Sequence, residues 1–279
     1  MSAVTTLPPK PAANASPGRG RLTQARVIKS EVLKLASLRS TRYSLLAGCL
    51  AMVLMPVAIA IFTMTQWAHL NPDDRDLDAI NNAVSGYQLA QLAVGVLGVL
   101  VITGEYSTGS IRSTFMAVPK RLPVLWAKLL VFCSATFALM LVSAFVAFLV
   151  TQPILHQHGL DKSLGDPHAV RCIIGAALYL TVIGALGVGL GTLIRNTAGG
   201  IATFVGILFV LPGVTALLPH ATAESVNRFL PVNAGSAVLT SRFEAFHRHL
   251  SPWIGFGVFC LYAAIAISVA AVKLVQRDV

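Results

Sequence analysis

Charged residues are scarce in this sequence. They make up 11% of its 279 residues, whereas hydrophobic residues make up 55%. Soluble domains carry about 25% charged residues, so the composition excludes an ordinary soluble domain. Because backbone polar groups in lipid must be satisfied within the protein, it predicts an all-α membrane protein with several spans. The net charge of +10 does not indicate nucleic-acid binding, because the basic residues cluster between apolar runs without interleaved aromatics.

Motifs that carry chemistry are also missing. The sequence holds no GxxxxGK[ST] phosphate loop, no HExxH and no GxSxG, so it predicts no enzyme activity and no catalytic, cofactor-binding or metal-ligating residue. Four cysteines without CxxC spacing are interpreted as small buried hydrophobes: Cys49, Cys133, Cys172 and Cys260. The pair His156 and His158 comes nearest to a metal motif, but it lacks a carboxylate or thiol at ligand spacing, and solvated loop histidines are the other interpretation.

Six segments are apolar and long enough to cross a bilayer, which takes about 20 residues. They are approximately Tyr43–Thr65, Tyr87–Thr103, Val124–Val150, Cys172–Ile194, Ala198–Leu218 and Trp253–Val272. No Asp, Glu, Lys, Arg or His lies deep in any of them, and Lys128 is close enough to one end to snorkel. Ion-coupled carriers and voltage sensors need such groups, so any uphill transport would draw its energy from a separate protein.

The basic residues favour one side of the membrane. The first 42 residues, the segment 104–123 with Lys128, the turn at Arg195 and the tail from Lys273 hold 15 of the 21 Lys and Arg. The opposite side holds eight of the 11 acidic residues, four of them in NPDDRDLD at 71–78. The positive-inside rule therefore predicts that both termini are cytoplasmic.

The segment that follows the second span, ITGEYSTGSIRSTFMAVPKR (102–121), combines charge with an apolar stripe. Its apolar residues recur at helical spacing: Ile111, Phe115 and Val118. Gly104 and Gly109 permit turns around Glu105, and Pro119 ends the helix. The pattern predicts a short amphipathic helix at the cytoplasmic surface.

The charges of this segment have a simpler interpretation as well. Glu105 could serve only to neutralise Arg112 or Lys128 at a helix end, and Lys120 and Arg121 could serve only to set topology.

A second basic amphipathic helix is predicted at 26–42, RVIKSEVLKLASLRSTR. One face carries four apolar residues: Ile28, Val32, Leu35 and Leu38. A lipid-surface anchor is the simplest role for such a helix, and contact with a partner protein is the alternative. Residues 1–25, rich in Pro, Ala, Ser and Gly, lack the apolar core of a signal peptide and are expected to form a disordered cytoplasmic tail. Residues 43–279 then form a six-helix membrane domain.

These two segments resemble the ABC-2 type transporter permeases, particularly an actinobacterial-like group of multidrug and antibiotic exporters. SEVLKLASLRSTR (30–42) is similar to the first helix of that group, although Val32 replaces an aromatic residue and Ala36 a basic one. GEYSTGSIRSTFMAVPKRLPVLWAK (104–128) follows the family's E-x3-G-x2-R-x6-P-x-R-x6-K pattern. RFLPVNAGSAV (228–238) resembles the segment before the last span of these permeases.

The resemblance implies a half-transporter. Two six-helix permeases, more often identical than different, would pair above two separate ATPase subunits that bind ATP and magnesium, and the segment 104–119 would be the coupling helix between the second and third spans. The residues that it implies for ATPase coupling are Glu105, Tyr106, Gly109, Arg112, Pro119, Arg121, Lys128 and Arg195. Those that it implies for the interfacial helix are Glu31, Lys34, Leu35 and Arg39.

Three further features each allow two interpretations. Gly187 and Gly191 form a GxxxG that serves either helix packing within one chain or a dimer seam. Pro56 and Pro212 should kink their spans, either as static bends or for gating. The loop 219–252, with its scattered apolar residues, should dip into the outer leaflet as packing or as an exit lid.

The function predicted from the sequence is that of a permease subunit of an ATP-driven exporter in a bacterial cytoplasmic membrane. The neutral spans favour a hydrophobic or amphipathic substrate, such as a drug, peptide or lipid. The alternatives are a non-transporting anchor or sensor for an ATPase and an ATP-independent channel.

Overall fold

The architecture is a bundle of long helices. The structure, a computed structural model, describes residues 24–69, 77–109, 121–215, 217, 219–241 and 250–276, and every regular element within these ranges is helical. The predicted all-α class is therefore confirmed. The amphipathic helix predicted around 111–118, including Arg112 and Pro119, lies outside the described residues.

Six helical segments are long and apolar enough to span a membrane. They are Arg39–Thr65, Ala79–Ser107, Leu122–His158, Ala169–Ile194, Thr197–Thr215 and Pro252–Gln276. Each predicted span falls on one of them. The second is longer than predicted because a short helix, α3 (Ala79–Val84), precedes α4 (Tyr87–Ser107). The third is also longer, because α6 (Arg121–Leu155) runs for 35 residues.

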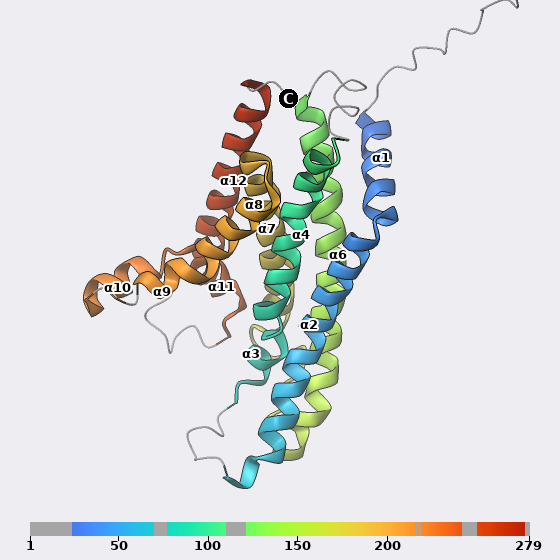
Figure 1. Ribbon diagram of the computed structural model, residues 1–279. Helices are drawn as coiled ribbons and strands as arrows, with labels where there is room; N and C mark the ends of the chain where they lie inside the picture. The colour runs from blue at the N-terminus through green and yellow to red at the C-terminus, as the bar shows by residue number, and fades with distance from the viewer. Residues whose placement is uncertain are drawn as a thin grey trace, which may run out of the picture.

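The first two helices follow each other almost without a break. α1 (Gln24–Ser37) is separated from α2 (Arg39–Thr65) by Leu38 alone. Figure 1 shows α1 beside the upper part of α6, at the end of the bundle where α4 ends and where α12 (Pro252–Gln276) also ends. Because the bundle has an even number of crossing segments, the first helix begins and the last helix ends at the same end of the bundle.

The centre of the bundle is α7 (Ala169–Ile194), which packs against α4, α6 and α12 and is largely buried. Its glycines let α4 approach closely. A side chain at Gly187 would overlap the carbonyl oxygen of Gly95, and a Cβ at Gly191 would lie 2.6 Å from Ile102 Cγ2. This surface of α7 is occupied by α4 of the same chain, so Gly187 and Gly191 are not available as a dimer seam.

The fifth span is broken into three pieces: α8 (Thr197–Val205), the π-helical turn η4 (Gly206–Val210) and α9 (Leu211–Thr215). π-Helical turns of this kind bend a helix. In Figure 1 the segment turns away from the bundle between α8 and α9, in the region of Pro212. Most of its length is exposed, including Phe209 and Val210.

The chain between the fifth and sixth spans re-enters the bundle. After α10 (His220–Asn227), α11 (Pro231–Ser236) and η5 (Ala237–Leu239) pack against α7 and α12. Gly235 has no room for a side chain because a Cβ would lie 2.7 Å from the rings of Tyr179 and Phe259. The Arg171 guanidinium donates to the Thr240 carbonyl over 2.9 Å. In this structure α11 and η5 therefore form part of the core.

The glycine contact between α4 and α7 gives a stability prediction. Gly187→Leu should lower the free energy of unfolding by about 1–3 kcal/mol or more, since overpacking forces two helix backbones apart. The matched control is Gly257→Leu on α12, where a Cβ meets no atom within 4 Å. Thermal unfolding of the purified proteins in one detergent measures both. Equal midpoints for the two variants would show that α4 and α7 are not in close contact.

Candidate functional site: a buried ring of charges at one end of the bundle

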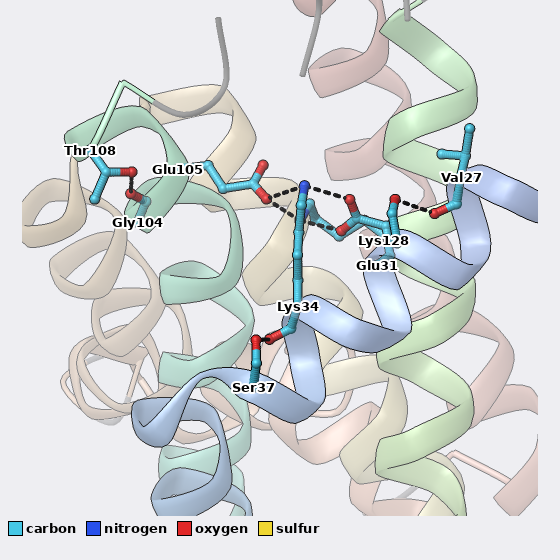
Figure 2. A network of polar contacts seen from close by, with 9 residues as sticks. Val27, Glu31, Lys34, Ser37, Gly104, Glu105, Thr108 and Lys128 are labelled. Carbon is cyan, nitrogen blue, oxygen red and sulfur yellow. Dashed lines mark hydrogen bonds and ion pairs between the residues drawn. The ribbon is translucent and has the colours of Figure 1, made fainter. Parts of the chain in front are cut away.

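Four charged side chains meet where α4 ends. Glu105 lies in the last turn of α4, Lys128 in the second turn of α6, and Glu31 and Lys34 on α1. Figure 2 shows the two lysine ammonium groups between the two carboxylates. We refer to these four residues as the charge ring.

Every acid of the charge ring is paired with both bases. The Lys128 ammonium donates to Glu31 Oε2 over 2.7 Å and to Glu105 Oε1 over 2.9 Å. The Lys34 ammonium donates to Glu31 Oε1 over 2.8 Å and to Glu105 Oε1 over 3.0 Å. The pairs join positions that are 71 and 97 residues apart in the chain, so the charge ring ties together α1, α4 and α6.

Three of these side chains are shielded from solvent. The exposed fraction is 3% for Glu31, 4% for Lys128 and 14% for Glu105, whereas Lys34 is 38% exposed. Burying a charge is costly unless it is paired and hydrogen-bonded. Each charge of the ring has two counter-ions, so removing one member leaves the other three with an unbalanced charge in a largely buried site.

The surroundings shift the protonation of both charged residues of α1. Burial alone raises the pKa of Glu31, but attraction to Lys128 and hydrogen bonds from Lys128 and Lys34 outweigh it, and the pKa of this carboxyl is lowered. Burial alone lowers the pKa of Lys34, but its bonds and attraction to Glu31 and Glu105 leave that pKa raised. Both residues are therefore held in their charged forms.

Apolar contacts place α1 for these pairings. Val27 packs against Val124 and Ala127, one turn before Glu31 meets Lys128. Successive turns of α1 thus contact successive turns of α6, and the two helices run in the same direction.

The packed face of α1 differs from the predicted apolar stripe. Val32 and Leu38 of that stripe are 48% and 55% exposed, whereas the buried residues are Val27 and Glu31, and Leu35 packs partly on the core. The prediction was wrong about this face because Glu31 is buried with its counter-ions. A hydrophobic pattern assigns every glutamate to the solvent-facing side, even when an ion pair buries it.

The residue after Glu105 makes a second connection. The Arg195 guanidinium lies over the Tyr106 ring, 5.4 Å from its centroid, a cation–π geometry. Arg195 is the left-handed residue that ends α7, and it also donates to the Lys273 carbonyl at 3.4 Å. Nearby, Thr197 donates to the Thr103 hydroxyl over 3.1 Å. The end of α4 is thereby joined to the α7–α8 turn and to α12.

The residues predicted for coupling are therefore partly brought together. Glu105, Tyr106, Lys128 and Arg195 converge on the end of α4, whereas Gly109 adopts φ +68° just beyond it, and Arg121 begins α6. On the predicted interfacial helix, Glu31 and Lys34 enter the charge ring, Leu35 packs against the core, and Arg39 is exposed at the start of α2.

The sequence interpretation missed the pairing of Glu31 with Lys128. Neutralisation of Glu105 by Lys128 was foreseen, but a second carboxylate on the same ammonium was not. The available signal was the position of Glu31, midway between Val27 and Leu35 on one helix face.

The outer histidines are arranged differently from the prediction. His156 does have a carboxylate partner, since its Nδ1 lies 3.0 Å from Asp161 Oδ1. His158 stacks on Trp67 at a ring distance of 4.3 Å. Within the described ranges, three or more His, Cys, Asp or Glu side chains nowhere gather closely enough to hold a metal ion.

The protein is a helical bundle with six spans, and among the described residues its only buried ionic cluster lies at one end. This arrangement is that of a membrane permease. Residues 27–213 match the family described as ABC-2 family transporter protein. The match covers well over half of the chain, which therefore belongs to the ABC-2 family and is an integral membrane permease of an ABC transporter. Family membership implies an ABC ATPase as its partner. No curated protein matches the sequence.

Loss of one lysine tests the charge ring. Lys128→Met should lower the free energy of unfolding by about 3–5 kcal/mol, because Glu31 and Glu105 then lose a buried counter-ion. Adding Glu31→Gln should restore part of this loss. The control is Lys29→Met, which changes an exposed lysine on α1. Thermal or denaturant unfolding in detergent measures all three, and equal stability of the Lys128 and Lys29 variants would contradict the pairing.

Acid should release the same contacts. Because the pKa of Glu31 in the folded protein lies below its ordinary 4.5, its contribution to stability is fully present above that pH and is lost as the pH falls through the lowered value. The difference in unfolding midpoint between the wild type and Glu31→Gln should be constant between pH 7 and 5 and should shrink below about 4.5. A difference that grows on acidification would reverse the assigned direction.

Proposed function

We propose that the chain is the permease subunit of an ATP-driven exporter. It would pair with a second copy of itself and dock on two ATPase subunits that bind ATP and magnesium. The membrane would be a bacterial cytoplasmic membrane, with both chain termini in the cytoplasm. Export of a hydrophobic or amphipathic compound, as in drug efflux, fits the scarcity of ionisable residues in the spans.

The charge ring is the observation that carries this proposal. Glu105 comes just before the segment 110–120 in the chain, and Lys128 follows soon after it. Both side chains are tied to the same α1 helix through Glu31 and Lys34. A force that the ATPase applies to that segment would therefore move α1, α4 and α6 together.

The Tyr106–Arg195 contact extends this route. It connects the end of α4 to the turn between α7 and α8, and the Arg195 bond to α12 continues it. The fifth span, with its π-helical turn and exposed surface, follows directly on this turn. Movement of the end of α4 would thus be transmitted to the fifth span, which is the least buried of the six spans.

The orientation is supported by the charges at this end of the bundle. α1 and the first turn of α2 contribute Arg26, Lys29, Lys34, Arg39 and Arg42 against Glu31 alone. Basic residues next to spanning helices favour the cytoplasmic side.

Charge inversion tests the coupling role. Glu105→Arg, and Arg112→Glu as a second variant, should leave ATP hydrolysis by the reconstituted complex within about twofold of wild type and lower transport at least tenfold. The physical reason is that an arginine at 105 faces two lysines and breaks the charge ring. Uptake of a fluorescent amphiphile into inverted vesicles, with ATP hydrolysis measured in parallel, gives both rates.

The control inverts a charge at the opposite end of the bundle. Lys162→Glu, in the exposed loop before α7, should keep both rates near wild type. Normal transport by the Glu105 and Arg112 variants would refute the coupling role. Absence of flux from the wild type with a bound, active ATPase would favour an anchor or sensor, and flux without ATP would favour a channel.

A further inference from the structure

A cavity lies against the charge ring, and Glu31, Lys34, Glu105 and Lys128 all contribute to its lining. It measures about 450 Å³ and lies between α1, the start of α2, the second half of α4 and the start of α6. This volume is within the roughly 300–1,000 Å³ range of small-ligand sites. Its walls are mostly apolar, and they are formed by Leu35, Leu38, Leu97, Leu100, Val101 and Val131.

One end of the cavity is polar and contains donors that the protein does not use. The Thr41 side chain lines the cavity and is 97% buried, with an exposed fraction of 3%, and its hydroxyl makes no hydrogen bond to any described residue. The Ser40 hydroxyl lies beside it. The Lys34 ammonium has three N–H donors and uses two of them in the charge ring. The Thr41 hydroxyl therefore reaches the cavity without a protein partner and can bond to a ligand there.

The same end of the cavity is the N-terminus of α2. This helix is 27 residues long, its N-cap is Leu38, and no side chain caps its first N–H groups. The first turn holds Arg39 and Arg42 and no acidic residue. Neither arginine forms an ion pair with a described residue. Cations are unfavourable at this positive end of the helix dipole, whereas the dipole would stabilise an anion there. Arg39 and Arg42 are exposed and do not line the cavity itself.

The charge ring does not neutralise this surplus. Its two acids balance its own two lysines, so Arg39 and Arg42 at the α1–α2 junction remain uncompensated, as do Arg26 and Lys29 nearer the start of α1. Each basic residue near a membrane surface contributes about 1 kcal/mol of attraction to anionic lipid.

We infer that this cavity binds one anionic phospholipid. One of its two acyl chains lies along the apolar wall formed by α1, α4 and α6, and the phosphate sits at the start of α2, beside Ser40 and Thr41. Arg39 begins a spanning helix, so this position corresponds to the headgroup level of a bilayer. The site requires neither transport nor an ATPase, and its test is therefore independent of the proposed function.

Gly104 provides the means to block the cavity. It lines the cavity, and a Cβ added there meets no atom within 4 Å. Gly104→Leu therefore fills the space of the acyl chain without displacing the backbone, and a leucine also raises helix propensity at this position. Gly257→Leu on α12, which is equally open, is the matched control. Thr41→Val removes only the unpartnered hydroxyl and keeps the side-chain shape.

The experiment compares two synthetic lipids with identical acyl chains, phosphatidylglycerol and phosphatidylcholine, added to the purified full-length protein in detergent. Native mass spectrometry counts bound lipids, and thermal unfolding measures stabilisation. We expect one tightly bound phosphatidylglycerol per chain, bound at least tenfold more tightly than phosphatidylcholine. Gly104→Leu should lose this binding, Thr41→Val should weaken it about fivefold, and Gly257→Leu should retain it.

Four results would overturn the inference. Equal binding of the two lipids would remove the role of the anionic headgroup. Unchanged binding by Gly104→Leu, when Thr41→Val is also unchanged, would place the lipid elsewhere on the protein. Equal stabilisation by glycerol phosphate, which has no acyl chain, would show a simple anion site. Absence of lipid binding by the wild type would mean that another occupant, such as a transported amphiphile or a protein segment, fills the cavity.

Discussion

Two carboxylates and two ammonium groups meet at one end of this bundle, and the largely buried charges of Glu31, Glu105 and Lys128 are stable there because each contacts its counter-ions. Glu31, Lys34, Glu105 and Lys128 satisfy one another across three helices, and the apolar contact of Val27 with Val124 and Ala127 holds α1 where the pairing is possible. Loss of any one member leaves an unbalanced charge among the other three, which is costly in a largely buried site. The charge ring converts three separate helix ends into one body at the end of the bundle where α4 stops and α6 begins.

The helices that adjoin the charge ring differ in how tightly they are packed. α7 is held on all sides, with Gly187 and Gly191 bringing the α4 backbone into contact, whereas the fifth span is bent by a π-helical turn and largely exposed. The contact between Tyr106 and Arg195 connects the end of α4 to the turn that leads into the weakly packed fifth span. This division, in which a rigid group of helix ends adjoins a weakly packed helix, fits the proposal that a partner ATPase drives the permease, since the spans carry no ionisable group deep in the membrane that could couple transport to an ion gradient.

The sequence predicted the features that depend on local hydrophobic pattern. It did not predict those that depend on contacts between residues far apart in the chain. Six apolar runs predicted six spans because hydrophobic length alone decides membrane insertion. The motif from Glu105 to Lys128 identified two members of the charge ring. Glu31 was not recognised as buried, because its partner Lys128 is 97 residues away and a helix pattern counts a glutamate as a solvent-facing residue. For the same reason the apolar stripe through Val32 and Leu38 was assigned to the wrong face. GxxxG spacing indicated close packing at Gly187 but not which helix packs there.

Distances between spin labels test the central claim most directly, namely that α1 and the start of α6 move as one body when the partner ATPase binds ATP. Labels at Lys29 on α1 and Trp126 on α6, both exposed positions, report distances within that body, and a label at Val226 on α10 reports the position of the body relative to the helices that follow the fifth span. The account predicts that ATP leaves the 29–126 distance unchanged and shifts the 29–226 distance. A change in the 29–126 distance as large as that between 29 and 226 would contradict it.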